Sequence, residues 1–298
     1  QGRAVLLIHH MDVVAAGPGW TVPPFAGLVR DGRLWGRGAV DDKSLGIAHL
    51  AAMLALKKKG GPRARDVIWM AVADEENGGG QGVAWLWAKR PDLFRGVEAV
   101  FGEGGANRQV NGRLLWWGIE VAQKRPLWLE VTAQGRGGHG SGLNPQSANH
   151  ELLRGLTRLI DAKPTWRVSP AARGYLRAIA PLHNPFWRDR LLDIDKVIRP
   201  DGPKGFLLPG LANLFLDTIQ VTVLGDGGRI NVIPEQAKAK VDIRLLPDTD
   251  SAAFLARVKS LLGKDLTVET LVTAPIAAPS PVDNWSYQRT AKVLAKEA

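Results

Sequence analysis

The sequence of 298 residues contains no cysteine, and only six of its residues are histidines. The absence of cysteine excludes disulfide bonds and thiolate metal sites, so any bound metal must be held by histidine, aspartate or glutamate. No apolar run reaches the length of a membrane-spanning helix, and no signal peptide is visible. Because the chain begins in an apolar run and stops inside a helical pattern, we expect a longer parent protein. Its compartment, cytoplasmic, periplasmic or secreted, stays open.

The composition is otherwise typical of a globular protein, with 45% hydrophobic and 23% charged residues over a length that suits two domains. The formal net charge of +10 raises the hypothesis of a nucleic-acid partner. Most of the surplus positive charge lies between residues 123 and 205, where the basic residues are scattered among apolar residues and prolines and form no compact run. This distribution favours a solvated basic face, and we expect no nucleic-acid partner.

The most informative stretch is Asp74-Glu75-Glu76, which is followed by three glycines at residues 78–80. It closes the apolar run at residues 67–72, which is typical of a buried strand. Like charges raise each other's pKa, and burial penalises every charged group, so consecutive carboxylates at this position are costly without a cation. The stretch therefore indicates either a metal site or a solvated acidic turn.

Polar side chains also follow two other apolar runs. Residues 4–8 lead into His10 and Asp12, which point to the same side of an extended segment because they are two residues apart. A carboxylate behind a histidine fixes the tautomer of the ring and raises its basicity. The predicted strand at residues 99–101 ends in Glu103 and glycines. Ligands gather at the carboxyl ends of strands in parallel sheets, so we expect these side chains to share a site.

Two aspartates, Asp41 and Asp42, precede a predicted helix at residues 44–59. Either one suits the helix N-cap, but only one can occupy that position. We therefore assign Asp41, which is further from the helix, as a metal ligand, and Asp42 as the cap or a supporting residue. Together with His10 and the other carboxylates, this set predicts two divalent ions that share a bridging carboxylate.

A different region begins near residue 124. Residues 126–133 alternate like a half-exposed strand, and the glycine-rich loop at residues 135–141 contains His139. Further elements are predicted at residues 146–161 (helix), 217–224 (strand), 236–245 (strand), 250–262 (helix) and 266–272 (strand). This alternation predicts an α+β unit inserted in an α/β domain, whereas residues 163–210, rich in Pro, Trp and Arg, stay unassigned.

These motifs, in this order, resemble the di-zinc exopeptidase family that includes aminoacylase, glutamate carboxypeptidase, succinyl-diaminopimelate desuccinylase and the carboxypeptidase S-like peptidases. The resemblance covers about residues 4–281, and residues 163–210 look most like the carboxypeptidase S-like branch. It rests on His10-Met11-Asp12, Gly36-Arg37-Gly38 with Asp41-Asp42-Lys43, Asp74-Glu75-Glu76, Glu103-Gly104-Gly105, Gly138-His139-Gly140-Ser141 and Asn231-Val232-Ile233-Pro234 with Arg244.

The resemblance implies a metal centre with two zinc ions, for which cobalt or manganese are alternatives. One zinc would be held by His10, Asp41 and Glu103. Asp41 would bridge to the second zinc, which Glu76 also holds. In the family the last zinc ligand is a histidine further along the chain, but this sequence has no histidine after His183. We expect the longer parent to be active and leave the activity of this chain open.

The resemblance also implies roles for residues that do not bind metal. Glu75 would be the general base, and Asp12 would orient the histidine ligand. His139 would reach the active site of a partner subunit and help stabilise the oxyanion. Asn231 and Arg244 would help bind the substrate, through its carboxylate. Family members are often dimers through the inserted domain, so we expect a homodimer.

The implied fold class is α/β, a zinc-exopeptidase-like catalytic domain with a mixed, largely parallel sheet, plus an inserted α+β dimerisation (lid) domain. We place the amino-terminal part of the catalytic domain at residues 1–123 and the inserted domain at residues 124–264. Residues 265–298 would begin the carboxyl-terminal part of the catalytic domain.

The predicted reaction is hydrolysis of an amide bond next to a free carboxylate, in a small peptide or an N-acyl amino acid. Metal ions would activate the water, and Glu75 would take its proton. Two alternatives stay open: a biosynthetic deacylase that accepts one N-acyl amino acid, and a non-catalytic binding protein that retains the fold. Cleavage of a single acylated amino acid, with dipeptides ignored, would favour the deacylase.

Overall fold

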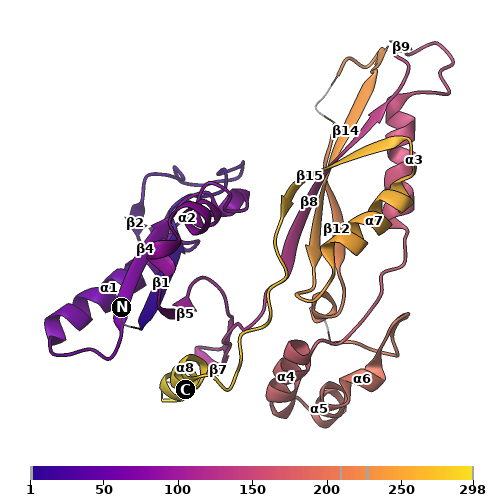
Figure 1. Ribbon diagram of the computed structural model, residues 1–298. Helices are drawn as coiled ribbons and strands as arrows, with labels where there is room; N and C mark the ends of the chain where they lie inside the picture. Colours follow the sequence, from indigo (N-terminus) through magenta and orange to yellow (C-terminus); the bar gives the residue numbers. More distant parts are fainter. Residues whose placement is uncertain (1–2, 209, 226–227, 297–298) are drawn as a thin grey trace. The chain divides into compact units, whose positions relative to one another are not determined.

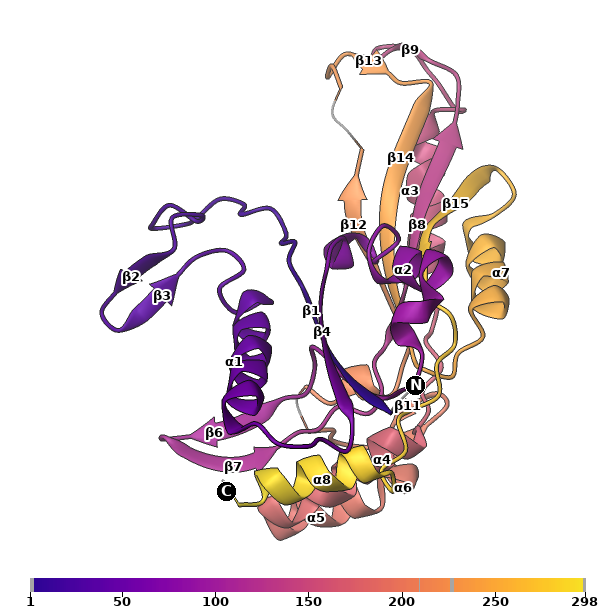
Figure 2. The same ribbon diagram turned by 60° about the vertical axis from the view of Figure 1, so that its left-hand side comes forward.

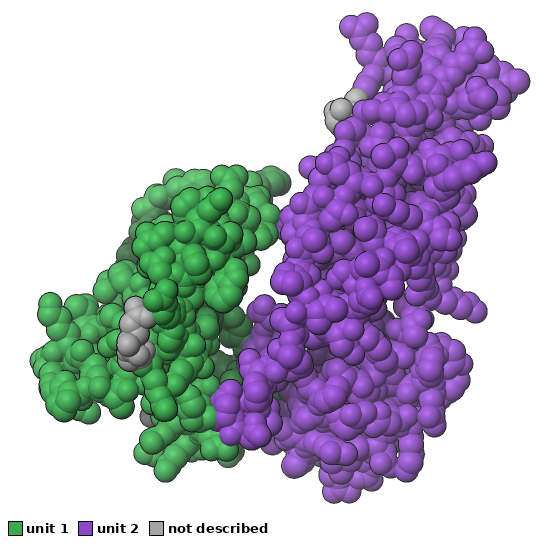
Figure 3. Space-filling view, viewed as in Figure 1, with its two compact units in different colours: residues 1–119, 285–298 green, residues 120–284 purple. Residues whose placement is uncertain are grey.

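The computed structural model describes residues 3–208, 210–225 and 228–296. The chain divides into two compact units, which Figure 3 shows in different colours. Unit 1 comprises residues 1–119 and 285–298, and unit 2 comprises residues 120–284. Within the described part of the chain, no helix is both long and apolar enough to cross a bilayer.

Unit 1 is built on a parallel three-stranded sheet in the order β4-β1-β5. Its strands are β1 (Ala4–His10), β4 (Asp66–Val72) and β5 (Val97–Phe101). His10 lies opposite Val72 in the register, and both strands therefore end at the same level. Because the strands are parallel, the loops that follow all three leave from the same edge of the sheet.

Two helices cover opposite faces of this sheet, α1 (Lys43–Lys59) and α2 (Val83–Lys89), as Figure 2 shows. Strand alternation places Leu6 on the face that packs against Leu86 of α2. The opposite face presents His9 to α1, where a Cβ on Gly46 would come within 2.5 Å of the His9 ring. This close approach explains a glycine inside a helix.

The remaining elements of unit 1 are short. They are β2 (Leu28–Arg30), β3 (Arg33–Trp35), η1 (Glu75–Asn77), η2 (Pro91–Phe94), β6 (Asn107–Val110), β7 (Arg113–Trp117) and α8 (Trp285–Leu294). β2 pairs with β3 and β6 pairs with β7 as antiparallel hairpins. The first hairpin turns at Asp31 and Gly32, which both have positive φ.

Unit 2 contains an antiparallel four-stranded sheet in the order β12-β14-β8-β15. Its strands are β8 (Arg125–Gln134), β12 (Thr218–Leu224), β14 (Gln236–Leu245) and β15 (Leu266–Thr273). Two helices, α3 (Ala148–Ile160) and α7 (Ser251–Leu262), pack on one face of the sheet, as Figure 1 shows. The alternating side chains Leu127, Leu129 and Val131 are fully buried beneath these helices.

A group of short helices fills the segment that the sequence left unassigned. It consists of α4 (Pro170–Ile179), η3 (Ala180–Leu182), α5 (Pro185–Leu192), α6 (Ile194–Val197) and η4 (Ala212–Leu214), with the small ribbon of β10 (Ile198–Arg199) and β11 (Gly202–Pro203). The hydroxyl of Ser169 caps α4 and the side chain of Asn184 caps α5, and each helix then begins with a proline.

The observed division of the chain differs from the predicted boundary at residue 264. β15 pairs along β8, from Leu266 opposite Ala133 to Thr273 opposite Leu127, so it belongs to the sheet of unit 2. The compact unit accordingly extends to residue 284. The sequence predicted the strand at residues 266–272 but not its partner. Because the partner strand β8 lies more than 130 residues earlier in the chain, the local pattern did not indicate which sheet the strand joins.

Candidate metal centre

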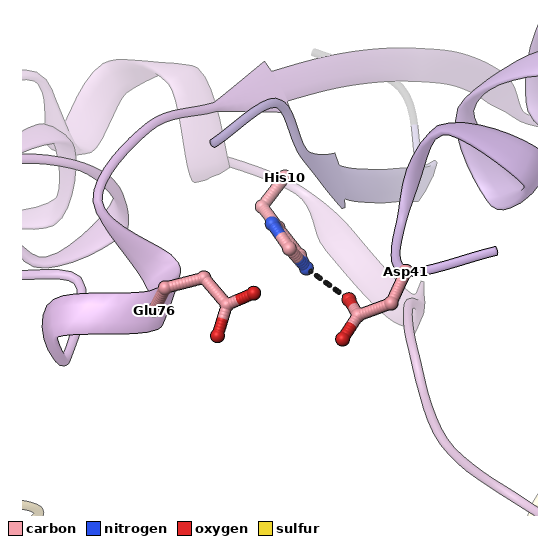
Figure 4. Close-up of side chains that lie close together, drawn as sticks. All are labelled: His10, Asp41 and Glu76. Carbon is pink, nitrogen blue, oxygen red and sulfur yellow. Dashed lines mark hydrogen bonds and ion pairs between the residues drawn. The ribbon is translucent and has the colours of Figure 1, made fainter. Parts of the chain in front are cut away.

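His10 is the centre of a cluster of acidic side chains at the carboxyl edge of the unit 1 sheet. Its side chain is buried, and its Nε2 lies 2.9 Å from Oδ1 of Asp41 and 3.5 Å from Oε2 of Glu103. Nδ1 lies 2.9 Å from the backbone carbonyl of Asp12. Since a carbonyl only accepts hydrogen bonds, Nδ1 carries a proton and Nε2 faces the carboxylates. Figure 4 shows this arrangement for His10, Asp41 and Glu76.

Asp12 contacts the His10 ring, which it was predicted to orient, more closely through its backbone carbonyl than through its carboxylate. Its carboxylate accepts hydrogen bonds from the backbone N–H groups of Glu75, at 3.2 Å, and Glu76, at 3.1 Å. Its Oδ1 is 3.5 Å from Nδ1 of His10, further than its own backbone carbonyl. Burial alone would raise the pKa of Asp12, but the two N–H groups outweigh it and lower the pKa. Asp12 therefore ties the acidic turn to the end of β1.

Asp41 and Asp42 project to different places from one short loop, and the peptide bond between them is cis. Asp42 stands at the N-cap position of α1, but its side chain makes no capping hydrogen bond. Instead, its buried Oδ2 accepts a hydrogen bond of 3.3 Å from the backbone N–H of His10. Of the two roles open to Asp42, the structure places it as a support for the histidine.

Two groups of side chains bring metal-binding atoms together. One group contains His10, Asp41 and Glu76, and the other contains His10, Asp42 and Glu103. In each group the ligand atoms lie within 4.8 Å of one another. The predicted zinc ligands thus gather around the imidazole ring of His10, although the second group contains Asp42 where Asp41 was predicted.

Two carboxylates of the cluster, Glu75 and Glu103, have raised pKa values. Burial raises the pKa of Glu103, and the Asp41 and Asp42 carboxylates raise it further. Burial also raises the pKa of Glu75, and the carboxylate of Glu76 adds to this effect. A divalent cation among these groups would favour their charged forms. Imidazole nitrogen with carboxylate oxygen is also a donor set that zinc accepts, so the residues present fit a divalent metal.

His139 and Asn231 lie together in unit 2. The two-residue strand β9 (Gly138–His139) pairs with β13 (Val232–Ile233), and His139 lies opposite Val232. The N–H of Gly140 donates to the carbonyl of Asn231 at 2.9 Å. His139 is exposed and its Nδ1 is 2.8 Å from the hydroxyl of Ser141. In Figure 2 the two strands stand beyond one end of β14.

Arg244 lies near the opposite end of β14 from that loop pair. Its guanidinium donates to both oxygens of Asp242, at 2.9 and 3.2 Å, and lies over the ring of Trp128. The strand begins at Gln236, and eight residues at about 3.4 Å each put roughly 27 Å between its start and Arg244. Within one chain, the structure therefore does not bring Arg244 together with His139 and Asn231.

Two supporting contacts of the site were not anticipated from the sequence. Lys43 donates from Nζ to the carbonyl of Met11 at 2.9 Å, and the N–H of Val14 donates to Oε1 of Glu76 at 3.2 Å. The Asp-Asp-Lys run was a signal for Lys43, because a lysine beside two carboxylates suggests a local partner. No sequence signal indicated the contact of Val14, whose partner is 62 residues away.

Comparison with known proteins assigns the chain to a family. The family described as Peptidase family M20/M25/M40 matches residues 6–284. The chain belongs to this family. The predicted resemblance to metal-dependent exopeptidases is thereby confirmed, and so is the predicted fold class, a mixed α/β domain with a second α+β domain.

Curated relatives of the chain include aminoacylases and carboxypeptidase S-like proteins. Aminoacylase-1 of Sus scrofa is 28% identical over 260 residues, which cover 86% of this chain and 54% of that protein. The probable carboxypeptidase S-like 2 of Dictyostelium discoideum is 25% identical over 299 residues, which cover 95% of this chain and 55% of that protein. The chain thus spans about half the length of these relatives. Since both kinds match at similar identity, the carboxypeptidase S-like branch stays a prediction.

The fold recurs in solved structures. The di-peptidase Dug1p from Saccharomyces cerevisiae superposes with a TM-score of 0.69 at 18% sequence identity, covering 100% of this chain and 67% of that one. At this identity the similarity concerns the fold.

Proposed function

We propose that the chain belongs to a metal-dependent amidohydrolase that cleaves an amide bond next to a free carboxylate, in a small peptide or an N-acyl amino acid. The observation that carries the proposal is the position of Glu75. It belongs to neither group of potential metal ligands, yet its neighbour Glu76 belongs to one, and its backbone is held by Asp12. A carboxylate beside a metal site but outside the ligand set is suited to move protons.

The residues proposed to hold metal are His10, Asp41, Glu76 and Glu103. His10, Asp41 and Glu103 would hold one zinc, and Asp41 would be shared with a second zinc held by Glu76, with cobalt or manganese as alternatives. A bound metal ion would lower the pKa of the attacking water and polarise the scissile carbonyl. His10 is prepared for this role because the Asp12 carbonyl fixes its protonated Nδ1 and leaves Nε2 as the ligand atom.

Glu75 is proposed to take a proton from the attacking water and to pass it to the leaving nitrogen. Its pKa is raised by burial and by the Glu76 carboxylate, which brings a carboxylate closer to the pKa that proton transfer near neutral pH requires. Because Asp12 holds the N–H groups of Glu75 and Glu76, the proton carrier and the ligand stay at a fixed spacing. In this proposal the Glu75 carboxylate would hold the proton removed from the water while the water oxygen bonds to the carbonyl carbon, and the same proton would then go to the leaving nitrogen.

The proposed substrate-binding residues support a homodimer. His139 and Asn231 lie at one end of the unit 2 sheet, and Arg244 lies near the other, roughly 27 Å along β14. A small substrate does not span that length, so residues at both ends serve one substrate only if two chains contribute. In the proposal, His139 and Asn231 act in the site of a partner subunit, where His139 stabilises the developing oxyanion.

The test is Glu75→Gln in the full-length parent, assayed on dipeptides and N-acyl amino acids. We expect zinc content to match the wild type and kcat to fall by about 10²- to 10⁴-fold, because the amide cannot accept a proton. The exposed Glu269→Gln on β15 is the matched control and should retain activity. Near-normal turnover of Glu75→Gln would overturn its role. Metal bound by the wild type without any turnover would favour the binding-protein alternative.

A further inference from the structure

Lys124 lies directly before β8 in unit 2 and is a partly buried cation without a carboxylate partner. Its Nζ donates to the hydroxyl of Thr218 at 3.0 Å and forms no ion pair with a carboxylate in the described part of the chain. Burial lowers the pKa of Lys124, Asp217 and Asp242 partly offset this effect, and Arg244 adds to it. A bound anion would favour the charged form of such a lysine.

Arg244 is the second cation at this end of the sheet. Thr218 and Arg244 lie directly opposite each other on β12 and β14. Opposite residues of antiparallel strands point to the same face, with Cα atoms about 4.5–5.5 Å apart. Asp242 binds Nε and Nη2 of Arg244, whereas Nη1 has no hydrogen-bond partner among the residues that the structure describes. Lys124 and Arg244 therefore both have N–H donors to spare.

The neighbouring charges do not supply the missing anion. Oδ1 of Asp217 accepts hydrogen bonds of 2.6 Å from the N–H of Leu246 and from the hydroxyl of Thr249. Arg125 is buried, and its guanidinium donates to a serine hydroxyl and to three backbone carbonyls. None of these acceptors is charged, so Arg125 has no counter-ion within the described ranges and adds to the positive potential at this end of the sheet.

We propose that Lys124 binds the side-chain carboxylate of an acidic amino acid while Arg244 binds its free α-carboxylate. The inference rests on the proposed function, in which Arg244 binds the substrate through its carboxylate. It narrows the substrate to peptides and N-acyl amino acids in which aspartate or glutamate carries the scissile amide nitrogen. Neighbouring strands are about 4.8 Å apart, a spacing that suits two carboxylates joined by a short carbon chain. Each carboxylate would accept charge-assisted hydrogen bonds from the unused donors.

The experiment compares N-acetyl-glutamate with N-acetyl-glutamine, which differ by one charge at nearly equal size. Calorimetric titration of the zinc-loaded chain measures binding, and assays of the zinc-loaded full-length parent measure hydrolysis. We expect affinity and kcat/KM to be about 10- to 100-fold higher for the glutamate ligand, because hydrogen bonds between charged groups are strong. Lys124→Met should abolish this preference by weakening only the glutamate ligand, and Lys124→Arg should retain it.

The pH response separates recognition of charge from a structural role of the lysine. Because its pKa is lowered, Lys124 loses its charge at a lower pH than an ordinary lysine, whose pKa is about 10.4. The preference for N-acetyl-glutamate should therefore shrink between pH 7 and pH 10 in the wild type. It should stay constant in Lys124→Arg, because arginine remains charged over this range. A preference that does not change with pH in the wild type would overturn the proposal.

Lys240→Met is the matched control, because Lys240 is exposed on the same face of β14 as Arg244 and the substitution removes the same charge. It should keep the preference. Equal affinity for both ligands in the wild type, or an equal loss for both in Lys124→Met, would overturn the role of Lys124, and hydrolysis of either ligand would still retain the proposed function. Tighter binding of N-acetyl-glutamate without hydrolysis by the zinc-loaded parent would contradict the proposed function and retain the role of Lys124.

Discussion

The two units use their sheets in different ways. In unit 2 the central strands β8 and β14 bury one face of the sheet, and Leu129 and Ile243 are both 0% exposed. In unit 1 the buried core is small, and the strand residues Trp69 and Val100 are 40% and 59% exposed. Apolar burial is the main source of folding free energy. The larger core lies in unit 2, which carries no proposed metal ligand, so we expect burial to stabilise unit 2 more than unit 1.

The polar side chains at the metal centre of unit 1 and on the open sheet face of unit 2 also differ, because the former are mostly acidic and the latter include pairs of opposite charge. In unit 1 several carboxylates converge on one buried histidine, and burial, with neighbouring carboxylates adding to it, raises the pKa of Glu75 and of Glu103. In unit 2 the open face of the sheet carries compensated pairs, such as Lys238 with Glu130 at 2.6 Å. This difference predicts that an added divalent cation stabilises unit 1 more than unit 2.

The largest expected effect is that of Leu129→Ala in β8. Removal of a fully buried leucine leaves a cavity and should lower the free energy of unfolding by about 2–5 kcal/mol. The loss should appear in unit 2, as faster amide hydrogen exchange in β8 and β14, and zinc affinity should stay unchanged. Reduced zinc affinity would show that the two units are coupled and would break the comparison.

Metal should have the complementary effect. Zinc at about 100 times its dissociation constant should stabilise the folded state by about 2.7 kcal/mol through mass action. Hydrogen exchange should slow near β1 and the acidic turn at residues 74–76 and stay constant in β8. His10→Asn should abolish this response, whereas His139→Ala in unit 2 should retain it. Equal protection of both units by zinc would contradict the comparison.

Asp12→Asn tests the link between the sheet edge and the acidic turn. The amide has one acceptor oxygen for two N–H groups, so we expect unit 1 to lose about 1–3 kcal/mol. Because the folded pKa of Asp12 lies below its usual value, its contribution is present above about pH 4 and is lost as pH falls through the folded pKa. Urea denaturation of the wild type and of Asp12→Asn should show a difference in the free energy of unfolding that is smaller at pH 3 than at pH 7.

The pH response of the metal-free chain has the opposite sign at His10. Burial lowers the pKa of His10, but the hydrogen bonds to Asp41 and Asp12 outweigh it and raise the pKa. The resulting stabilisation is complete below the unfolded value, about 6.5, and is lost as pH rises through the folded pKa. With chelator present, the stability difference between wild type and His10→Asn should narrow from pH 5.5 to pH 9. A stability difference that stays constant from pH 5.5 to pH 9 would show that the charge of His10 does not stabilise the fold.

The smallest effect is expected for Lys238→Ala on the open face of the unit 2 sheet. Nζ of Lys238 is partly exposed and lies 2.6 Å from Oε1 of Glu130, and such pairs contribute at most about 1 kcal/mol. Urea denaturation at low and high salt should show little change. If Lys238→Ala lowered the free energy of unfolding as much as Leu129→Ala, the open face of the sheet would stabilise unit 2 as strongly as the buried face.

Local patterns predicted most elements well. Residues 236–245 alternate between apolar and polar and form β14, and the apolar run at residues 67–72 lies within β4. The helices α4 and α5 were missed because Pro and Trp obscured their periodicity. A signal was nevertheless present, since Ser169-Pro170 and Asn184-Pro185 each combine an N-cap residue with a proline at the first helical position.

By itself the sequence determined the chemistry of the site. The absence of cysteine left nitrogen and oxygen donors, and the carboxylates that follow apolar runs marked the strand ends. Only the tertiary structure decided which atoms meet. The order β4-β1-β5 placed His10 on the central strand, and the loop path turned Asp42 to its backbone and Asp41 to its ring. These contacts join residues more than 30 positions apart, so they depend on strand register and loop path, which local patterns do not encode.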